Sequence, residues 1–227
     1  MSAAPSSPVD LANAGGYLVV TIDDGKANAL SVEIIDGLRS AIATAVQLRK
    51  PLVIAGRDGC FSAGFDLAIM TSGEEEEVME LLGRGARLYR QAIEAPVPIV
   101  ASCSGHALAG GALLLLCADY RIGRTGPYRL GLNEVAIGMA LPSFAVAVAS
   151  HRIEHRFLTS ATMFAEVASP ERALEMGFLD ELGLDPLPRA CSLAAELAGL
   201  PGDAFAATKR RVWRGLRKEL EALEELA

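Results

Sequence analysis

The sequence has few of the residues that build metal sites and disulfide frameworks. Its 227 residues include three histidines and four cysteines, the latter at positions 60, 103, 117 and 191, and no Cys-x-x-Cys pair. Cysteines in apolar stretches usually pack in the core as small hydrophobic residues with reduced thiols. Free thiols of this kind are typical of cytoplasmic proteins. We therefore expect no metal site, no disulfide and a cytoplasmic location.

Long apolar runs and an excess of basic residues are also missing. No stretch of about 18 apolar residues occurs, and the N-terminal residues lack the basic and apolar regions of a secretory signal. Lys and Arg total 21 against 28 Asp and Glu, a net charge of −7, which argues against a reader of duplex nucleic acid. We expect neither a membrane nor a nucleic-acid partner.

The chain does have apolar material for a large core, because 51% of its residues are apolar and 22% are charged. Its length favours one domain, and no linker rich in Pro, Gly or Ser divides it. We expect a mobile leader over residues 1–14, a core over residues 15–165 and a helical C-terminal region of the same domain over residues 166–227.

Short apolar strands alternate with helices in the first half of the chain. Runs rich in β-branched residues favour strands, and apolar residues that recur at the helical period favour helices. Strands that alternate with helices predict an α/β layered fold. Strands are expected over residues 17–22, 52–55 and 98–102, and helices after a capping Ser31 and over residues 74–94 and 112–117.

The second half is predominantly helical. Ser169 and Pro170, followed by Gly177, predict a two-turn helix with a cap, a proline at the first helical position and a glycine past its end. Asp203 is expected to cap one last helix that reaches residue 224. An apolar stripe of the kind that packs on a partner runs along this helix: Phe205, Val212, Leu216, Leu220 and Leu223.

Two glycine-containing segments could carry chemistry. In residues 59–67, Gly64 frees the following N–H groups to face a ligand, although an isolated glycine turn is also a common connector. Residues 104–111 open an apolar helix with two glycines, which exposes N–H groups at the positive end of the helix dipole; close packing is the other interpretation. We interpret His106 as a packed loop histidine, not a base.

Glu134 is the third candidate, and it is the only acid between Arg124 and His151. A carboxylate among apolar neighbours has its charged form disfavoured, so its pKa rises and it can exchange protons near neutral pH. From spacing alone, a surface glutamate on a turn is an equally good interpretation.

In combination these segments resemble the crotonase (enoyl-CoA hydratase/isomerase) superfamily. The resemblance covers most of the chain and implies a crotonase/ClpP-like spiral of ββα units, in the α/β (α+β) class, with a helical tail that assembles homotrimers or dimers of trimers. The motifs that carry it stand in this order: Lys26-Ala-Asn-Ala-Leu30, Phe61-Ser-Ala-Gly-Phe-Asp-Leu67, Gly105-His-Ala-Leu-Ala-Gly-Gly111, Gly131-Leu-Asn-Glu134 and Ala173-Leu-Glu-Met-Gly-Phe-Leu-Asp180.

The resemblance implies an acyl-CoA thioester as substrate and no separate cofactor. It places two oxyanion-hole N–H groups on Phe65 and Gly110, where they would hold the thioester oxygen. Phe65 is bulkier than the alanine of many relatives, so we expect its ring to narrow the acyl pocket. The resemblance also assigns CoA binding to residues of two loops: Lys26, Ala27, Ala29, Leu30, Ala63, Asp66 and Leu67. Among them, Lys26 is the expected contact to a CoA phosphate.

The acids separate the reactions of this superfamily. Its hydratases use two glutamates to activate water, and here the earlier position falls on Leu113 while Glu134 occupies the later one. The pattern is similar to the single-glutamate Δ3,Δ2-enoyl-CoA isomerases, in which one base moves a proton from C2 to C4. We expect enoyl-CoA isomerisation. The alternatives are hydration or another crotonase reaction, and a non-catalytic acyl-CoA-binding protein.

The last helix also carries a basic cluster. Its residues could meet CoA phosphates or form a solvated face paired with the later glutamates, and we favour the second interpretation. The cluster consists of Lys209, Arg210, Arg211, Arg214, Arg217 and Lys218.

Overall fold

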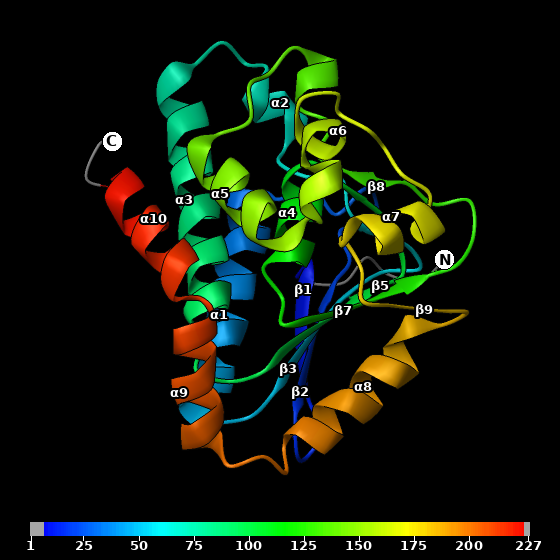
Figure 1. Ribbon diagram of the computed structural model, residues 1–227, viewed down its shortest axis with the longest axis vertical. Coiled ribbons are helices and arrows are strands. Elements are labelled where there is room, and N and C mark those ends of the chain that lie inside the picture. Colours follow the sequence, from blue (N-terminus) through cyan, green and yellow to red (C-terminus); the bar gives the residue numbers. More distant parts are fainter. Residues whose placement is uncertain (1–6, 225–227) are drawn as a thin grey trace.

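The computed structural model describes residues 7–224 (Figure 1). A six-stranded sheet in the order β1-β2-β3-β5-β7-β9 runs through its centre. Its strands are parallel, except that β1 pairs with β2 in the antiparallel sense. These strands are β1 (Val9–Asn13), β2 (Leu18–Ile22), β3 (Leu52–Gly56), β5 (Ile99–Cys103), β7 (Tyr120–Arg124) and β9 (Glu181–Gly183).

A second, smaller sheet packs against the large one. Its three parallel strands are β4 (Gly59–Ser62), β6 (Gly105–Leu108) and β8 (Leu130–Gly131). Along the chain, a strand of the large sheet is followed by one of the small sheet and then by a helix, three times in succession. The expected ββα spiral is therefore confirmed, although residues 59–62 and 105–108, which we expected as connecting loops, are strands.

Helices cover both faces of the large sheet (Figure 1). Because both faces are covered, β3 and β5 are buried and their sequences are almost entirely apolar, with Ser102 as the one polar residue. The main core lies under α1 (Val32–Leu48), α3 (Glu75–Glu94) and α4 (Gly110–Leu116), and α8 (Pro186–Leu197) covers the opposite face. The shorter helices are α2 (Leu67–Met70), α5 (Ser143–Arg152), α6 (Leu158–Thr162) and α7 (Pro170–Met176). In the part of the chain that the structure describes, no helix is long and apolar enough to cross a membrane.

The two helix starts with the strongest sequence signals are confirmed. The Ser31 hydroxyl accepts a hydrogen bond from the Ile34 N–H at the start of α1. The Ser169 side chain accepts from the Arg172 N–H at the start of α7, which ends at Gly177 in a left-handed conformation with φ of 90°. Both signals are local, so they depend little on the rest of the fold.

The prediction of a mobile leader is wrong for the residues just before β2. Val9–Asn13 form β1, and only residues 1–6 of the expected leader lie outside the described residues. Val9 packs against α1, where a Cβ at Gly37 would lie 2.9 Å from the Val9 Cβ. The other four residues of β1 are exposed, so the strand shows no alternation of apolar and polar residues that would have marked it.

The expected single last helix is also wrong. It is two helices, α9 (Gly202–Val212) and α10 (Arg214–Glu224), separated at Trp213, whose buried ring lies 4.4 Å from the guanidinium carbon of Arg152. Pro201, not Asp203, occupies the capping position of α9, and Asp203 forms an ion pair with Arg49. The C-terminal region is not purely helical either, because it supplies β9 to the large sheet.

The apolar stripe of this region is largely covered by the chain itself. Leu216 and Leu220 are buried, and α10 packs against α5 and α3. Val212 is 72% exposed, and the side chain of Leu223 lies outside the described residues. The stripe therefore does not form the continuous free face that we expected to meet a partner.

The prediction that the basic cluster is solvated is wrong for Lys209. It is the buried residue of α9, and its Nζ donates to Asp119 Oδ2 at 2.7 Å and to the carbonyls of Ala92 and Val97 at 3.3 and 3.4 Å. Burial lowers the pKa of Lys209, and the neighbouring Asp119 carboxylate opposes this effect. Lys209 thus anchors α9 to the body of the protein and is not part of a solvated face.

Candidate active site

Asn28 joins the loop after β2 to strand β4. The residue is fully buried, and its side-chain amide donates to the carbonyls of Ile22, Cys60 and Phe61 at 2.9, 3.2 and 3.2 Å. Its Oδ1 accepts from the Asp24 N–H at 3.1 Å. A buried amide with all these partners holds two segments that are distant in sequence in a fixed relation.

As a result, the two loops assigned to CoA lie side by side. The Ala63 N–H donates to the Ala27 carbonyl at 3.0 Å, and the Leu30 N–H donates to the Gly64 carbonyl at 2.7 Å. Leu30 is itself buried in the core, so only its backbone faces the loops. Asp66 accepts from the Ala68 N–H and caps α2. The structure therefore brings the two loops with the predicted CoA-binding residues together, although the Leu30 side chain is in the core.

Lys26 is exposed on this surface and has a basic neighbour that sequence reasoning missed. The Arg57 Nε donates to the Lys26 carbonyl at 2.7 Å. The two residues are 31 positions apart, and no spacing in the sequence indicates that β3 carries Arg57 to this loop. Two cations at one edge of the loop pair are suited to bind a phosphate group.

Gly64 places Phe65 against the start of α4. Its φ is +94°, and a Cβ there would lie 2.9 Å from the Ala109 Cβ and 3.1 Å from the Gly110 N. Because any side chain would collide at this position, only glycine allows the approach. The two residues to which the resemblance assigned the oxyanion hole are therefore adjacent in space.

The backbone at the start of α4 is strained. Ala109 has a φ of 48° and a ψ of −126°, which a residue with a side chain rarely adopts, and α4 has no side-chain cap hydrogen bond. Among the hydrogen bonds of the described residues, neither the Phe65 N–H nor the Gly110 N–H is a donor. Two uncommitted N–H groups next to a helix N-terminus can stabilise a developing oxyanion.

Glu134 reaches the same region from the turn after β8. The Ala109 N–H donates to the Gly131 carbonyl at 2.9 Å, which fixes this turn to the start of α4. The Oε2 of Glu134 is buried and has no hydrogen-bond partner among the described residues. Burial raises the pKa of the Glu134 carboxyl, and its own backbone N–H lowers it to a smaller extent. Glu134 is therefore not a surface glutamate, and it can act as a proton acceptor and donor.

Helix α4 carries no second acid. All seven of its residues are buried and uncharged, and Leu113 is 1% exposed. A leucine side chain cannot bind or deprotonate water. Chemistry that needs a pair of acids therefore has no second carboxylate on this helix.

Tyr89 of α3 is a further residue of the site that sequence reasoning missed. Its hydroxyl donates to the Gly110 carbonyl at 2.9 Å, and its ring contacts those of Phe65 and Phe144, with centroids 6.2 and 5.8 Å away. Burial raises the pKa of Tyr89 well above its ordinary value, and the nearby Cys117 and Glu134 raise it further. In the sequence, Tyr89 is one more large residue on the buried face of a helix, so nothing marked it.

His106 is a packed residue, as we interpreted it. Its Nδ1 accepts a hydrogen bond from the Arg129 N–H at 3.1 Å, and its ring meets Tyr128 edge to face at 5.5 Å. Both contacts hold β6 to the segment before β8. The imidazole therefore has a structural partner and no contact that would make it a base in this site.

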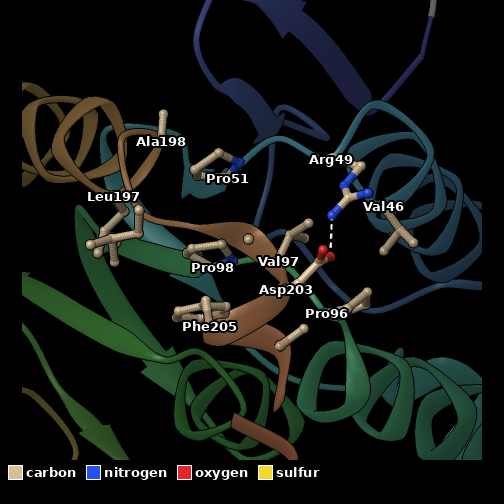
Figure 2. Close-up of a pocket in the computed structure, with 13 residues that line it drawn as sticks. Val46, Arg49, Pro51, Pro96, Val97, Pro98, Leu197, Ala198, Asp203 and Phe205 are labelled. Atoms are coloured by element: carbon tan, nitrogen blue, oxygen red, sulfur yellow. Dashed lines mark hydrogen bonds and ion pairs between the residues drawn. The ribbon is translucent and has the colours of Figure 1, made fainter. Parts of the chain in front are cut away.

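A separate cavity of about 210 Å³ lies where α1 ends and the chain enters α9 (Figure 2). Apolar side chains such as Val46, Pro51 and Phe205 line it, and the ion pair between Arg49 and Asp203 stands at one side. The cavity shares no residue with the loops around Gly64, Gly110 and Glu134. Its one acid, Asp203, is 92% exposed and paired with Arg49, so we do not place the chemistry there.

Comparison with known proteins identifies the family. The family model described as enoyl-CoA hydratase/isomerase matches residues 13–226. The chain belongs to the enoyl-CoA hydratase/isomerase family. A solved structure of an enoyl-CoA hydratase/isomerase family protein from Pseudomonas syringae superimposes with a TM-score of 0.92 at 36% identity, over 96% of each chain.

Relatives of this family member carry two kinds of names. The mitochondrial enoyl-CoA delta isomerase 1 of Mus musculus is 28% identical over 178 residues, which are 77% of this chain and 62% of the relative. A probable enoyl-CoA hydratase of Bacillus subtilis (strain 168) is 32% identical over 192 residues, 79% of this chain and 72% of the relative. The chain thus spans about three fifths of the length of the mouse isomerase.

Proposed function

We propose that this chain is an enoyl-CoA isomerase that moves a double bond from C3 to C2 of an acyl-CoA. The observation that carries the proposal is the single unpartnered, buried Oε2 of Glu134, opposite an α4 that carries Leu113 and no acid. One carboxyl group is sufficient for isomerisation, because the same group takes up the proton and gives it back. The enoyl-CoA thioester is the substrate, and the proposed reaction needs no other cofactor.

In the proposed reaction, the Glu134 carboxylate removes a proton from C2 of a 3-enoyl-CoA. The electron pair of the broken C–H bond moves into the conjugated system, and the thioester oxygen takes the negative charge of the dienolate. The N–H groups of Phe65 and Gly110 stabilise this oxygen. The protonated Glu134 then returns its proton to C4, which leaves the double bond between C2 and C3 and restores the carboxylate.

Hydration of a 2-enoyl-CoA is the second candidate, because hydratases occur among the named relatives. It needs a group other than Leu113 to hold water. The two reactions are separated by offering the wild type both a 3-enoyl-CoA and a 2-enoyl-CoA. Migration of the 3-enoyl double bond is the expected result, and rapid water addition without any migration would contradict the proposal.

A chain that only binds acyl-CoA would behave differently again. Solvent deuterium enters C2 of an acyl-CoA only if a base and an oxyanion hole both work on the bound thioester. We expect this exchange with the wild type. Tight binding of an acyl-CoA with no exchange would favour the non-catalytic alternative.

We propose that Lys26 contacts a CoA phosphate, with Arg57 beside it. Replacement of Lys26 by Ala removes one exposed cation, so CoA affinity is expected to fall by about 3- to 10-fold and to depend less on salt. Titration of CoA at two salt concentrations measures both effects. An affinity that is unchanged and equally sensitive to salt would show that the phosphates bind elsewhere. The half-buried Lys50, which donates to the Asn13 side chain, provides a control.

We also propose that the chain assembles as a homotrimer or a dimer of trimers. Met163 and Phe164 at the end of α6 are 66% and 74% exposed, which supports a contact between chains at this place. Sedimentation at micromolar concentration is expected to show a species of at least three chains. A species of only 23.8 kDa, the mass of one chain, would contradict the assembly.

A further inference from the structure

The ring of Phe65 lies in a space that two glycines leave open. A Cβ at Gly85 of α3 would lie 2.4 Å from the Phe65 Cζ and 2.5 Å from its Cε1. A Cβ at Gly110 would lie 3.0 and 3.1 Å from the Cδ2 and Cε2 of the same ring. Any side chain at Gly85 would therefore collide with the ring, and the ring already touches the backbone of α3.

The same ring lies next to both proposed oxyanion donors. Phe65 carries one of the N–H groups, and its ring contacts Gly110, which carries the other. A thioester oxygen held by both N–H groups would bring the thioester carbon, and C2 beyond it, close to Phe65. Tyr89 and Phe144 continue this row of aromatic side chains.

We propose that Phe65 is a specificity-determining residue that restricts the acyl group to chains unbranched at C2. The inference rests on the proposed function, because it requires the thioester oxygen at the Phe65 and Gly110 N–H groups. A methyl branch on C2 needs space beside the carbon that carries the transferred proton. The ring cannot give this space, since α3 at Gly85 and the edge of Tyr89 close off the directions in which it could withdraw.

The glycine at position 85 supports a specific role for the packing of the Phe65 ring against α3. Glycine weakens a helix interior, and α3 contains two glycines, Gly83 and Gly85. A Cβ at Gly83 would meet only the end of the Arg87 side chain at 3.5 Å, an ordinary contact. Gly85 alone of this pair is required by the ring. Phe65 packs against the core but is only half-buried, so part of its side chain remains accessible.

The experiment measures the binding of two saturated isomers, butyryl-CoA and isobutyryl-CoA, which differ by a branch at C2. The wild type is expected to bind the unbranched ester more tightly. Phe65→Ala is expected to raise the affinity for isobutyryl-CoA relative to butyryl-CoA by about 10-fold or more, since one methyl group in an apolar pocket is typically worth about 10- to 200-fold. Phe65→Leu, which fills more of the space, keeps the test available if the alanine variant does not fold.

Variants of α3 test the direction in which the ring is confined. Gly85→Ala pushes the ring toward the donors, so the affinity for both esters is expected to fall. The matched control Gly83→Ala is expected to leave both affinities unchanged. The combination of Phe65→Ala with Gly85→Ala removes the collision, and it is expected to recover the affinity that Gly85→Ala alone loses.

The possible results separate the inference from the proposed function. If neither ester binds to the wild type, the proposed function is wrong. If both bind, but Phe65→Ala and Phe65→Leu leave the ratio of the two affinities unchanged, Phe65 does not set the specificity and the inference is overturned while the proposed function stands.

Discussion

Replacement of Glu134 by Gln is expected to lower double-bond migration in a 3-enoyl-CoA by at least about 100-fold while CoA affinity persists. Glutamine keeps the shape of the side chain but cannot accept the C2 proton. The measurement is kcat on a 3-enoyl-CoA together with the dissociation constant of CoA. Glu171→Gln, an exposed glutamate in the first turn of α7, is the matched control and is expected to retain full activity.

A fall in CoA affinity that matched the fall in kcat would contradict this assignment, because Glu134 would then be a binding residue. Migration that continued at the wild-type rate would exclude Glu134 as the base altogether. Conversion of Leu113 to Glu, tested on a 2-enoyl-CoA, asks whether a second acid introduces hydration. Burial of a new carboxylate at this position costs several kcal/mol, so only an active, folded variant is informative.

The same glutamine variant is expected to lose activity but to gain stability. Burial raises the pKa of Glu134, so the folded chain holds this proton more tightly than the unfolded chain does. The resulting contribution favours the folded state at low pH and is lost as the pH rises through the raised pKa. At pH 7, Glu134→Gln is therefore expected to melt at a higher temperature than the wild type, and the difference is expected to shrink at acidic pH.

Replacement of Asp119 by Ala is expected to destabilise the protein by about 3 kcal/mol, because it leaves the buried Lys209 ammonium without its counterion. The Asp119 Oδ2 also accepts from the Ile99 N–H at 2.9 Å, and this partner is lost as well. Urea unfolding monitored by the fluorescence of Trp213, the one tryptophan, measures the change.

The exposed pair of Arg49 and Asp203 provides the control for this experiment. Their side chains are 69% and 92% exposed, so solvent screens the attraction and Asp203→Ala is expected to cost less than about 1 kcal/mol. Equal losses from Asp119→Ala and Asp203→Ala would show that burial of Lys209 adds nothing to its ion pair.

Features with a local cause were predictable from the sequence. The caps at Ser31 and Ser169 depend on neighbours three residues away, and both formed as predicted. The conformations of Gly64 and Gly177 follow from the same local logic. The candidate residues Phe65, Gly110 and Glu134 were found because their segments form an ordered set of motifs, and the structure brings these segments together.

Features that depend on distant contacts were not predictable in this way. Tyr89 bonds to a carbonyl 21 positions away, and Arg57 bonds to one 31 positions away. At the break between α9 and α10, the Trp213 ring packs on Arg152, which belongs to another helix. The edge strand β1 is held by backbone pairing and most of its side chains are exposed, so its sequence lacks the apolar and polar alternation that predicts a strand.

The anchoring of α9 by Lys209 has a consequence for helix register. A helix held by an apolar stripe can slide or rotate slightly and keep most of its contacts, because apolar attraction has no direction. The Lys209 ammonium, in contrast, reaches one carboxylate and two carbonyls from a single axial position of α9. Lys209 lies in the last turn of α9, directly before α10. Helix α10 packs on α3 and α5, which carry Tyr89 and Phe144. The alignment of the aromatic row beside the candidate oxyanion donors is thus tied to a polar contact that ends on Ala92, about one turn of α3 from Tyr89.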